Sequence, residues 1–417
     1  MSRSSPFAHL RGVSRLIVDL TVIVTDVVET MHHNIAKRPG VLGRATLDPA
    51  SGVTGLVYRS VRGVTRVVGR TIDAVLRPLE PLLAEAPVGP GRDAVLSVLN
   101  GVLGDHLDAS ANPLAIPMDL RIRGMRLPLD RTEIARILPQ PRERVVVMVH
   151  GLCTSDTVWN RREHDHGQSL ARDLHANAVY LRYNSGRHIS TNGAEFATLL
   201  ERLVEAWPVP LRDLILVGHS MGGLIIRSAC ATGENFGHRW LRLLRALVFL
   251  GTPHQGAPLE RGGHGVDLLF SASPYTVAFA RLGQLRSAGI TDLRHGSVLD
   301  NDWHGRDRFG RAGYLQHAQP LPRGVPAFAI AGSLSRAAPT HGKPRGDGLV
   351  PVASALGWHD DPDMAIGIDP ARQWIAYGTG HLDLLCSSLV YEQIKGWLGG
   401  ASVASFALPA RATRRRP

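Results

Sequence analysis

The stretch Leu214-Ile215-Leu216-Val217-Gly218-His219-Ser220-Met221-Gly222 decides the fold class of this chain of 417 residues. Its first four residues form a continuous apolar run, which is typical of a strand covered on both faces of a parallel sheet. A helical stretch follows over residues 221–231, so the chain turns from strand to helix at Ser220. Glycines two positions before and after the serine let the backbone turn tightly. The pattern therefore predicts a serine hydroxyl that is held out at the end of a strand.

Strand-like and helical segments alternate on both sides of this stretch. The other apolar runs that predict strands are Val145–Val149, Ala178–Tyr183, Ala246–Leu250, Ala327–Ala331 and a run near Gln373–Ala376. The helical stretches are 167–176, 193–206, 221–231 and 383–398. The alternation predicts an α/β fold with a mainly parallel sheet wrapped by helices, and short antiparallel strands are expected near Gly124. Residues 255–322 interrupt the alternation, and we expect this insert to lie outside the sheet.

A second loop offers the groups that an acyl-transfer reaction needs. The run Val145–Val149 leads directly into His150, Gly151 and Leu152. Acyl transfer creates an oxyanion, and two backbone N–H groups have to point at its position in advance. Gly151 would let the loop fold back so that the Leu152 N–H faces the site, and the Met221 N–H would be the second donor. We expect His150 to be a structural loop residue rather than a proton carrier.

The partners of the serine are expected later in the chain, in the order carboxylate and then histidine. Asp347 lies between two glycines in a loop, and His381 follows a glycine-bounded loop ahead of the last helical stretch. His381 would deprotonate Ser220 and then protonate the leaving group, while Asp347 would fix the tautomer of His381. The alternatives are the carboxylates Asp360, Asp361, Asp363 and Asp369, which sit in a polar stretch typical of a solvated loop, and His359, which lacks a glycine-bounded loop.

Together these motifs resemble those of the α/β-hydrolase superfamily. The resemblance is to bacterial triacylglycerol lipases and esterases and to the GPI inositol-deacylase-like branch, and it covers residues from about 140 to 398. The motifs that carry it are His150-Gly151-Leu152, Gly218–Gly223, Gly251–Gly256, Asp347-Gly-Leu-Val-Pro and Gly-His381-Leu-Asp. The resemblance implies the α/β-hydrolase fold, a catalytic Ser220, Asp347 and His381, and an ester or lipid substrate. It does not fix which ester.

We expect three parts along the chain. Residues 1–110 form a helical N-terminal extension, 111–400 an α/β-hydrolase catalytic domain with 255–322 as a candidate lid, and 401–417 a basic, disordered tail. In the extension, apolar residues from Val57 to Val75 recur at helical spacing beside a face of arginines. This amphipathic helix fits either adsorption to an anionic membrane surface or packing on the catalytic domain.

Composition and charge favour some classes of binding partner over others. The net charge is +11, and residues 1–80 together with the tail carry much of the excess. This excess fits contact with a membrane surface. Nucleic-acid binding is not expected, because no recognisable binding motif is present and aromatic residues make up only 6% of the chain. We expect no cofactor, because no dinucleotide fingerprint or P-loop follows a strand.

The sequence signals for metal binding and for targeting are also weak. His164-Asp165-His166 is interpreted as a solvated loop rather than a metal site. The apolar run Leu16–Val28 is interrupted by two aspartates and predicts neither a cleaved signal peptide nor a membrane-spanning helix. Three cysteines cannot form a disulfide framework, which favours a reducing, cytoplasmic compartment. Peripheral association with a membrane stays open.

The sequence predicts a serine hydrolase that cleaves carboxylic esters, with lipids or other apolar acyl compounds as substrates, through an acyl-enzyme. Two alternatives remain. One is an acyltransferase that uses the same triad, and the other is a non-catalytic, membrane-associated protein on a hydrolase fold. The acyl-chain length, the physiological substrate and the oligomeric state are not fixed by the sequence.

Overall fold

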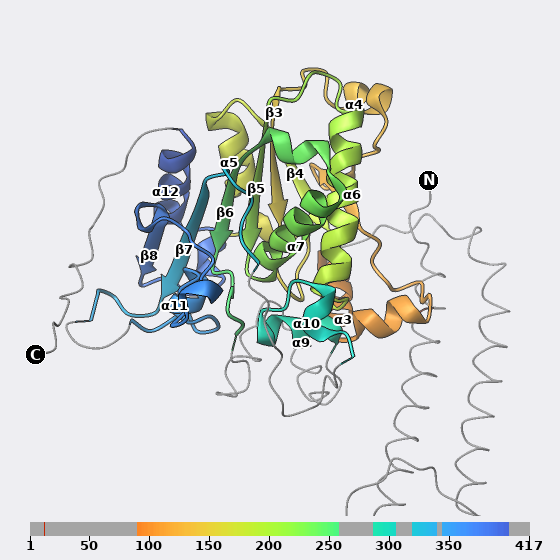
Figure 1. Cartoon of the computed structure of the whole chain (residues 1–417). Coiled ribbons are helices and arrows are strands. Elements are labelled where there is room, and N and C mark those ends of the chain that lie inside the picture. Colours follow the sequence, from red (N-terminus) through yellow and green to blue (C-terminus); the bar gives the residue numbers. More distant parts are fainter. Residues whose placement is uncertain (1–11, 13–89, 258–286, 306–318, 340–343, 400–417) are drawn as a thin grey trace, which may run out of the picture. The chain divides into compact units, whose positions relative to one another are not determined.

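The computed structural model describes residues 12, 90–257, 287–305, 319–339 and 344–399 (Figure 1). The chain divides into two compact units, Met1–Arg92 with His106–Ala115 and Asp93–Asp105 with Ile116–Pro417. The sheet belongs to the second unit. The expected amphipathic helix from Val57 to Val75, the tail and much of the insert lie outside the described residues.

Eight strands form one sheet in the order β2-β1-β4-β3-β5-β6-β7-β8. They are β1 (Asp119–Ile122), β2 (Met125–Arg126), β3 (Arg144–Val149), β4 (Asn177–Arg182), β5 (Asp213–His219), β6 (Leu244–Leu250), β7 (Ala327–Ser333) and β8 (Gln373–Tyr377). Strands β3 to β8 pair in parallel, whereas β1 is antiparallel to both β2 and β4. The mainly parallel sheet and the antiparallel pair near Gly124 are therefore confirmed.

Helices cover the sheet on both faces (Figure 1). The helices of the described residues are α3 (Pro90–Ala109), α4 (Arg131–Ile137), α5 (His166–Asp173), α6 (Ile189–Ala206), α7 (Met221–Phe236), α9 (Ala288–His295), α10 (Asp300–Trp303), α11 (Val352–Ala355) and α12 (Ser388–Leu398). On the two faces of the sheet lie α5 with α12 and α7 with α6. Helices α5 and α12 share a core cluster with alternate residues of the strands. Helix α7 contacts β3, β5 and β6 and packs along α6. Within the described part of the insert, residues 287–305 contribute α9 and α10 and no strand.

The apolar runs form the core because their side chains are buried on both faces. Every residue from Val145 to Val149 in β3 is fully buried, and so are Leu216 and Val217 in β5. Burial of a side chain of this size contributes about 1.5–3 kcal/mol, which explains why continuous apolar runs mark these strands. No helix within the described residues is long and apolar enough to span a membrane.

All four expected helices have boundaries that differ from the sequence-based expectation. The helix expected at 193–206 begins earlier, at Ile189, and the helix expected at 221–231 continues to Phe236. The helix expected at 167–176 ends at Asp173, because Leu174 leaves helical geometry and His175 has a left-handed φ of 51°. The helix expected at 383–398 is interrupted. A short 3-10 turn, Asp383–Leu385, comes first, and α12 starts only after Ser387, whose hydroxyl accepts a hydrogen bond from the Val390 N–H.

Candidate active site

Ser220 occupies the turn between β5 and α7. Its backbone has φ 54° and ψ −125°, a left-handed conformation that costs a non-glycine residue about 1–3 kcal/mol. The turn is held because the Ser220 N–H donates to the Leu250 carbonyl at 2.9 Å. A Cβ atom at Gly222 would lie 2.2 Å from the Val149 carbonyl oxygen, so only glycine allows this approach of helix to strand. The strained serine is the sharp strand-to-helix turn that the sequence predicts.

Asp347 and His381 form a buried pair. His381 Nδ1 donates to Asp347 Oδ2 at 2.7 Å, and both residues are only 1% exposed. The second carboxylate oxygen, Oδ1, accepts the backbone N–H groups of Leu349 and Val350 at 3.0 and 2.8 Å. This network assigns the proton to Nδ1 and leaves His381 Nε2 as an acceptor. Nε2 is buried and has no hydrogen-bond partner among the residues that the structure describes, so it is available to take a proton.

The serine and the Asp–His pair meet at the carboxyl ends of the parallel strands. Gly251, which follows β6, links the two parts, because its neighbour Leu250 accepts the Ser220 N–H. A Cβ atom on Gly251 would lie 3.1 Å from Asp347 Oδ2 and 3.2 Å from His381 Cε1. The three predicted residues therefore come from β5, the loop after β7 and the loop after β8, and they converge around the end of β6.

The predicted oxyanion loop lies against the serine. A Cβ atom on Gly151 would be 3.1 Å from Ser220 Cβ. Leu152 and Met221 are both buried, and among the described residues neither backbone N–H has a hydrogen-bond acceptor. Met221 is the first residue of α7, where backbone N–H groups have no partner within the helix. Both donors are thus free to bind a negatively charged oxygen.

Side chains just after the end of β4 hold the predicted oxyanion loop in place. The Tyr183 hydroxyl donates to the His150 carbonyl at 2.8 Å, and the two rings stack with their centroids 4.3 Å apart. The Ser185 hydroxyl accepts the Cys153 N–H at 3.1 Å. Sequence reasoning missed both residues, because neither belongs to a motif and only the strand pairing brings them to the loop.

His150 is a structural residue of this loop, in agreement with the expectation. Its side chain is fully buried, and Nδ1 donates to the Gly151 carbonyl at 2.8 Å. Burial lowers the pKa of His150 to about 3. The ring is therefore neutral at physiological pH and supports the turn at Gly151.

His219 and His166 are two further residues that the sequence did not single out for this site. His219 Nε2 donates to the His381 carbonyl at 3.0 Å, and burial lowers the pKa of His219 well below its usual value. His166 Nε2 donates to the Leu384 carbonyl at 2.9 Å, three residues beyond His381. Two buried, neutral histidines thus hold the loop that carries His381.

The segment that contains His166 differs from the expected solvated loop. His166 is completely buried, and its Nδ1 lies 2.7 Å from His164 Nε2, a hydrogen-bond distance. Asp165 caps α5 by accepting the Gln168 N–H. Solvation was the wrong expectation because the chain folds these side chains against Leu384 and Tyr391. No cluster of three or more metal-ligating side chains occurs in the part of the chain that the structure describes.

The alternative acid and base candidates lie apart from this arrangement. Asp360, Asp361, Asp363, Asp369 and His359 are all exposed. Asp361 and Asp369 accept backbone N–H groups at the start of short 3-10 turns, and His359 accepts the Asp361 N–H at 3.0 Å. These contacts give Asp361, Asp369 and His359 local structural roles.

Comparison with known proteins finds one matching family model. Residues 140–312 match the family model described as the PGAP1-like alpha/beta domain, which confirms the resemblance carried by the motifs. No curated protein matches the chain.

Several solved structures resemble the chain at low identity. The mature form of the Bacillus licheniformis lipase BlEst2 is 17% identical, and the similarity covers 68% of this chain and 99% of the lipase, with a TM-score of 0.40. An esterase from Thermogutta terrifontis is 15% identical over 63% of this chain and 92% of its own, with a TM-score of 0.35. A lipase-esterase related protein from Clostridium acetobutylicum is 12% identical over 61% and 94%, with a TM-score of 0.35. Residues 140–312, which match the PGAP1-like alpha/beta domain, contain strands β3 to β6 at the centre of the eight-stranded, mainly parallel sheet.

Proposed function

We propose that the protein is a serine hydrolase that cleaves carboxylic esters, with Ser220 as nucleophile, His381 as general base and acid, and Asp347 as the group that orients His381. The observation that carries this proposal is the buried hydrogen bond of 2.7 Å between His381 and Asp347, beside a serine with φ 54°. A buried carboxylate that fixes one histidine tautomer and leaves the other nitrogen as an acceptor is what activation of a serine hydroxyl requires.

The proposed reaction has two halves. Ser220 Oγ attacks the ester carbonyl carbon while His381 Nε2 accepts the hydroxyl proton, and the N–H groups of Leu152 and Met221 bind the oxyanion. The intermediate collapses, the alcohol leaves with the proton from His381, and an acyl-serine remains. Water, deprotonated by His381, then attacks the acyl carbon, which releases the carboxylic acid and restores the Ser220 hydroxyl.

Apolar acyl substrates are the second part of the proposal. They are supported by the resemblance of the motifs to lipases and by the PGAP1-like family match. The insert 255–322 is proposed as a lid, and the extension 1–110 as an aid to contact with a membrane surface, in front of a catalytic domain at 111–400. These assignments are independent of the reaction class, so they need a separate test.

The reaction class is tested by covalent labelling with a fluorophosphonate, which reacts with activated serines. We expect labelling of the wild type and its loss in Ser220→Ala. The matched control is Ser228→Ala, which makes the same chemical change on the same helix, at a buried position. Absence of Ser220-dependent labelling in a folded protein would leave the non-catalytic alternative.

The substrate class is tested with an ester panel that runs from short to long acyl chains, with and without anionic vesicles. We expect turnover to rise with chain length and with vesicles. A preference for short, soluble esters that is indifferent to vesicles would refute the lipid assignment and leave the ester hydrolase intact. Measuring ester formation with an added alcohol in the same panel detects acyl transfer.

A further inference from the structure

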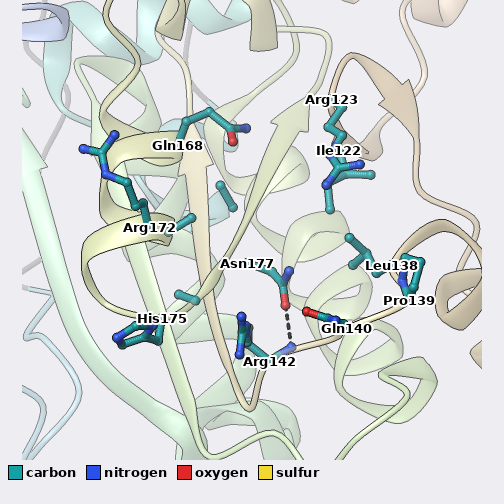
Figure 2. A pocket seen from close by; sticks show the side chains of 13 residues that line it. Ile122, Arg123, Leu138, Pro139, Gln140, Arg142, Gln168, Arg172, His175 and Asn177 are labelled. Carbon is teal, nitrogen blue, oxygen red and sulfur yellow. Dashed lines mark hydrogen bonds between the residues drawn. The ribbon is translucent and has the colours of Figure 1, made fainter.

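A hollow of about 810 Å³ lies at the end of the sheet where β3 and β4 begin (Figure 2). Its wall is formed by the turn after β1, by the segment that leads from α4 to β3, and by α5 with the segment that follows it. Ser220 lies at the carboxyl end of β5, which runs parallel to β3. A strand of six residues spans about 20 Å, so the hollow is distinct from the candidate active site.

The hollow is lined by cationic side chains and by no carboxylate. Figure 2 shows Arg123 on one side, Arg172 and His175 on the other, and Arg142 between them. None of the 13 lining residues is an aspartate or a glutamate. Guanidinium groups stay charged at every physiological pH, so at least three positive charges surround one space.

Two of the three guanidinium charges are not neutralised by any described residue. Among the described residues, the Arg123 and Arg142 side chains have no hydrogen-bond or ion-pair partner. Arg172 does have partners: its Nε donates to Asp173 Oδ1 at 2.9 Å, and its guanidinium group also interacts with the Tyr391 hydroxyl. The Asp173 side chain is only 18% exposed and also pairs with Lys395 Nζ at 3.0 Å, so it neutralises the charge of Arg172 in part. An anion in the hollow would therefore meet guanidinium donors that are not already used.

The rest of the lining suits a ligand that carries an organic part beside its charge. Ile122, Leu138 and Ala178 supply buried apolar surface. A hydrogen bond also fixes the wall of the hollow: Asn177 Oδ1 accepts the backbone N–H of Arg142 at 2.7 Å (Figure 2). This hydrogen bond joins the start of β4 to the segment before β3. The amide groups of Gln140 and Gln168 also line the space and offer further donors.

We propose that this hollow is a second binding site, which takes the phosphate group of an organic phosphate. Guanidinium groups match phosphate oxygens with paired N–H donors, and the apolar wall accepts the carbon part of the molecule. Two sources offer this chemistry: a soluble phosphate ester and the headgroup of an anionic phospholipid. The site does not depend on the proposed reaction at Ser220.

The test measures phosphate binding by the full chain at 0.15 M salt, roughly the physiological ionic strength. Isothermal titration with inorganic pyrophosphate probes the soluble source, and flotation with phosphatidylcholine vesicles that contain phosphatidic acid probes the lipid source. The variant is the double substitution Arg123→Ala/Arg142→Ala. The control, Arg202→Ala/Arg242→Ala, removes the same charge at two exposed positions outside the hollow. Circular dichroism checks that both variants are folded.

We expect the wild type and the control to bind at least one probe, and the Arg123→Ala/Arg142→Ala variant to bind it at least tenfold more weakly. Binding of pyrophosphate assigns a soluble ligand, and binding of vesicles alone assigns a lipid headgroup. Equal losses in the variant and the control would overturn the proposal, because they would show attraction to net charge only. Failure of the wild type to bind either probe would overturn it as well.

Discussion

Gly251 offers the most direct test of the packing around His381. The residue has φ 56°, and a methyl group at its Cα would lie 2.8 Å from Leu384 Cδ1, 3.1 Å from Asp347 Oδ2 and 3.2 Å from His381 Cε1. Gly251→Ala therefore pushes a methyl group against both members of the Asp–His pair. Leu384 is fully buried, so it has little room to move away.

The expected loss of stability in Gly251→Ala is estimated by comparison with Gly237. Gly237 has a similar φ of 65°, and a Cβ atom there would meet nothing within 4 Å. Alanine in a left-handed conformation costs about 1–2 kcal/mol at either position. Overpacking at Gly251 adds about 1–3 kcal/mol. We expect Gly251→Ala to lower the free energy of unfolding by about 2–5 kcal/mol, and Gly237→Ala by about 1–2 kcal/mol.

Two assays separate the loss of stability caused by backbone strain from the displacement of His381. Urea unfolding gives the free energies of the two variants. The rate of fluorophosphonate labelling at Ser220 then reports how well His381 is placed, and a displacement of about 1 Å can slow such a reaction about 100-fold. We expect slow labelling in folded Gly251→Ala and wild-type labelling in Gly237→Ala. Equal stability and equal labelling of the two variants would refute the packing described around His381.

Three further predictions concern the loops and the core. Tyr183→Phe removes the hydroxyl that donates to the His150 carbonyl, so we expect a loss of about 1 kcal/mol in urea unfolding and labelling slowed about tenfold; unchanged labelling would contradict a role in placing the oxyanion loop. Burial lowers the pKa of His166 from 6.5 to about 4, so between these values the unfolded chain binds the proton and stability falls with falling pH. His166 alone should remove about 2 kcal/mol between pH 7 and pH 5, and a flat stability profile over this range would speak against neutral burial. Gly193→Ala places a methyl group 2.2 Å from Ser228 Oγ, between α6 and α7; we expect a loss of about 1–3 kcal/mol, and thermal unfolding at the wild-type temperature would exclude such close packing.

The strands were predictable because burial on both faces leaves a clear mark in the sequence. The apolar run Val145–Val149 lies within β3, Arg144–Val149, and Ala327–Ala331 lies within β7, Ala327–Ser333. Helix ends were less predictable, because they depend on single backbone conformations. His175 illustrates this: nothing in its surroundings in the sequence requires the left-handed φ that follows the end of α5.

The residues of the candidate site also differ in whether a local sequence pattern predicts them. The sequence predicts Ser220, Asp347 and His381, because each lies in or directly after a glycine-bounded turn. Tyr183 and Ser185 could not, since their role depends on β4 pairing with β3, which brings the end of one strand beside the loop after the other. Long-range pairing of this kind leaves no local pattern.

The abundance of histidine in the chain has a structural explanation around the candidate site. Nineteen histidines made any single one a weak candidate, and three of them, His150, His166 and His219, are buried and donate to backbone carbonyls. Burial lowers the pKa of each, so none carries a charge at neutral pH. A neutral imidazole fills apolar space and still offers one N–H donor, and this combination suits a loop carbonyl beside a packed core. Burial of neutral histidines also makes the loops around Ser220 sensitive to low pH, because protonation of any of these rings would place a charge in the core.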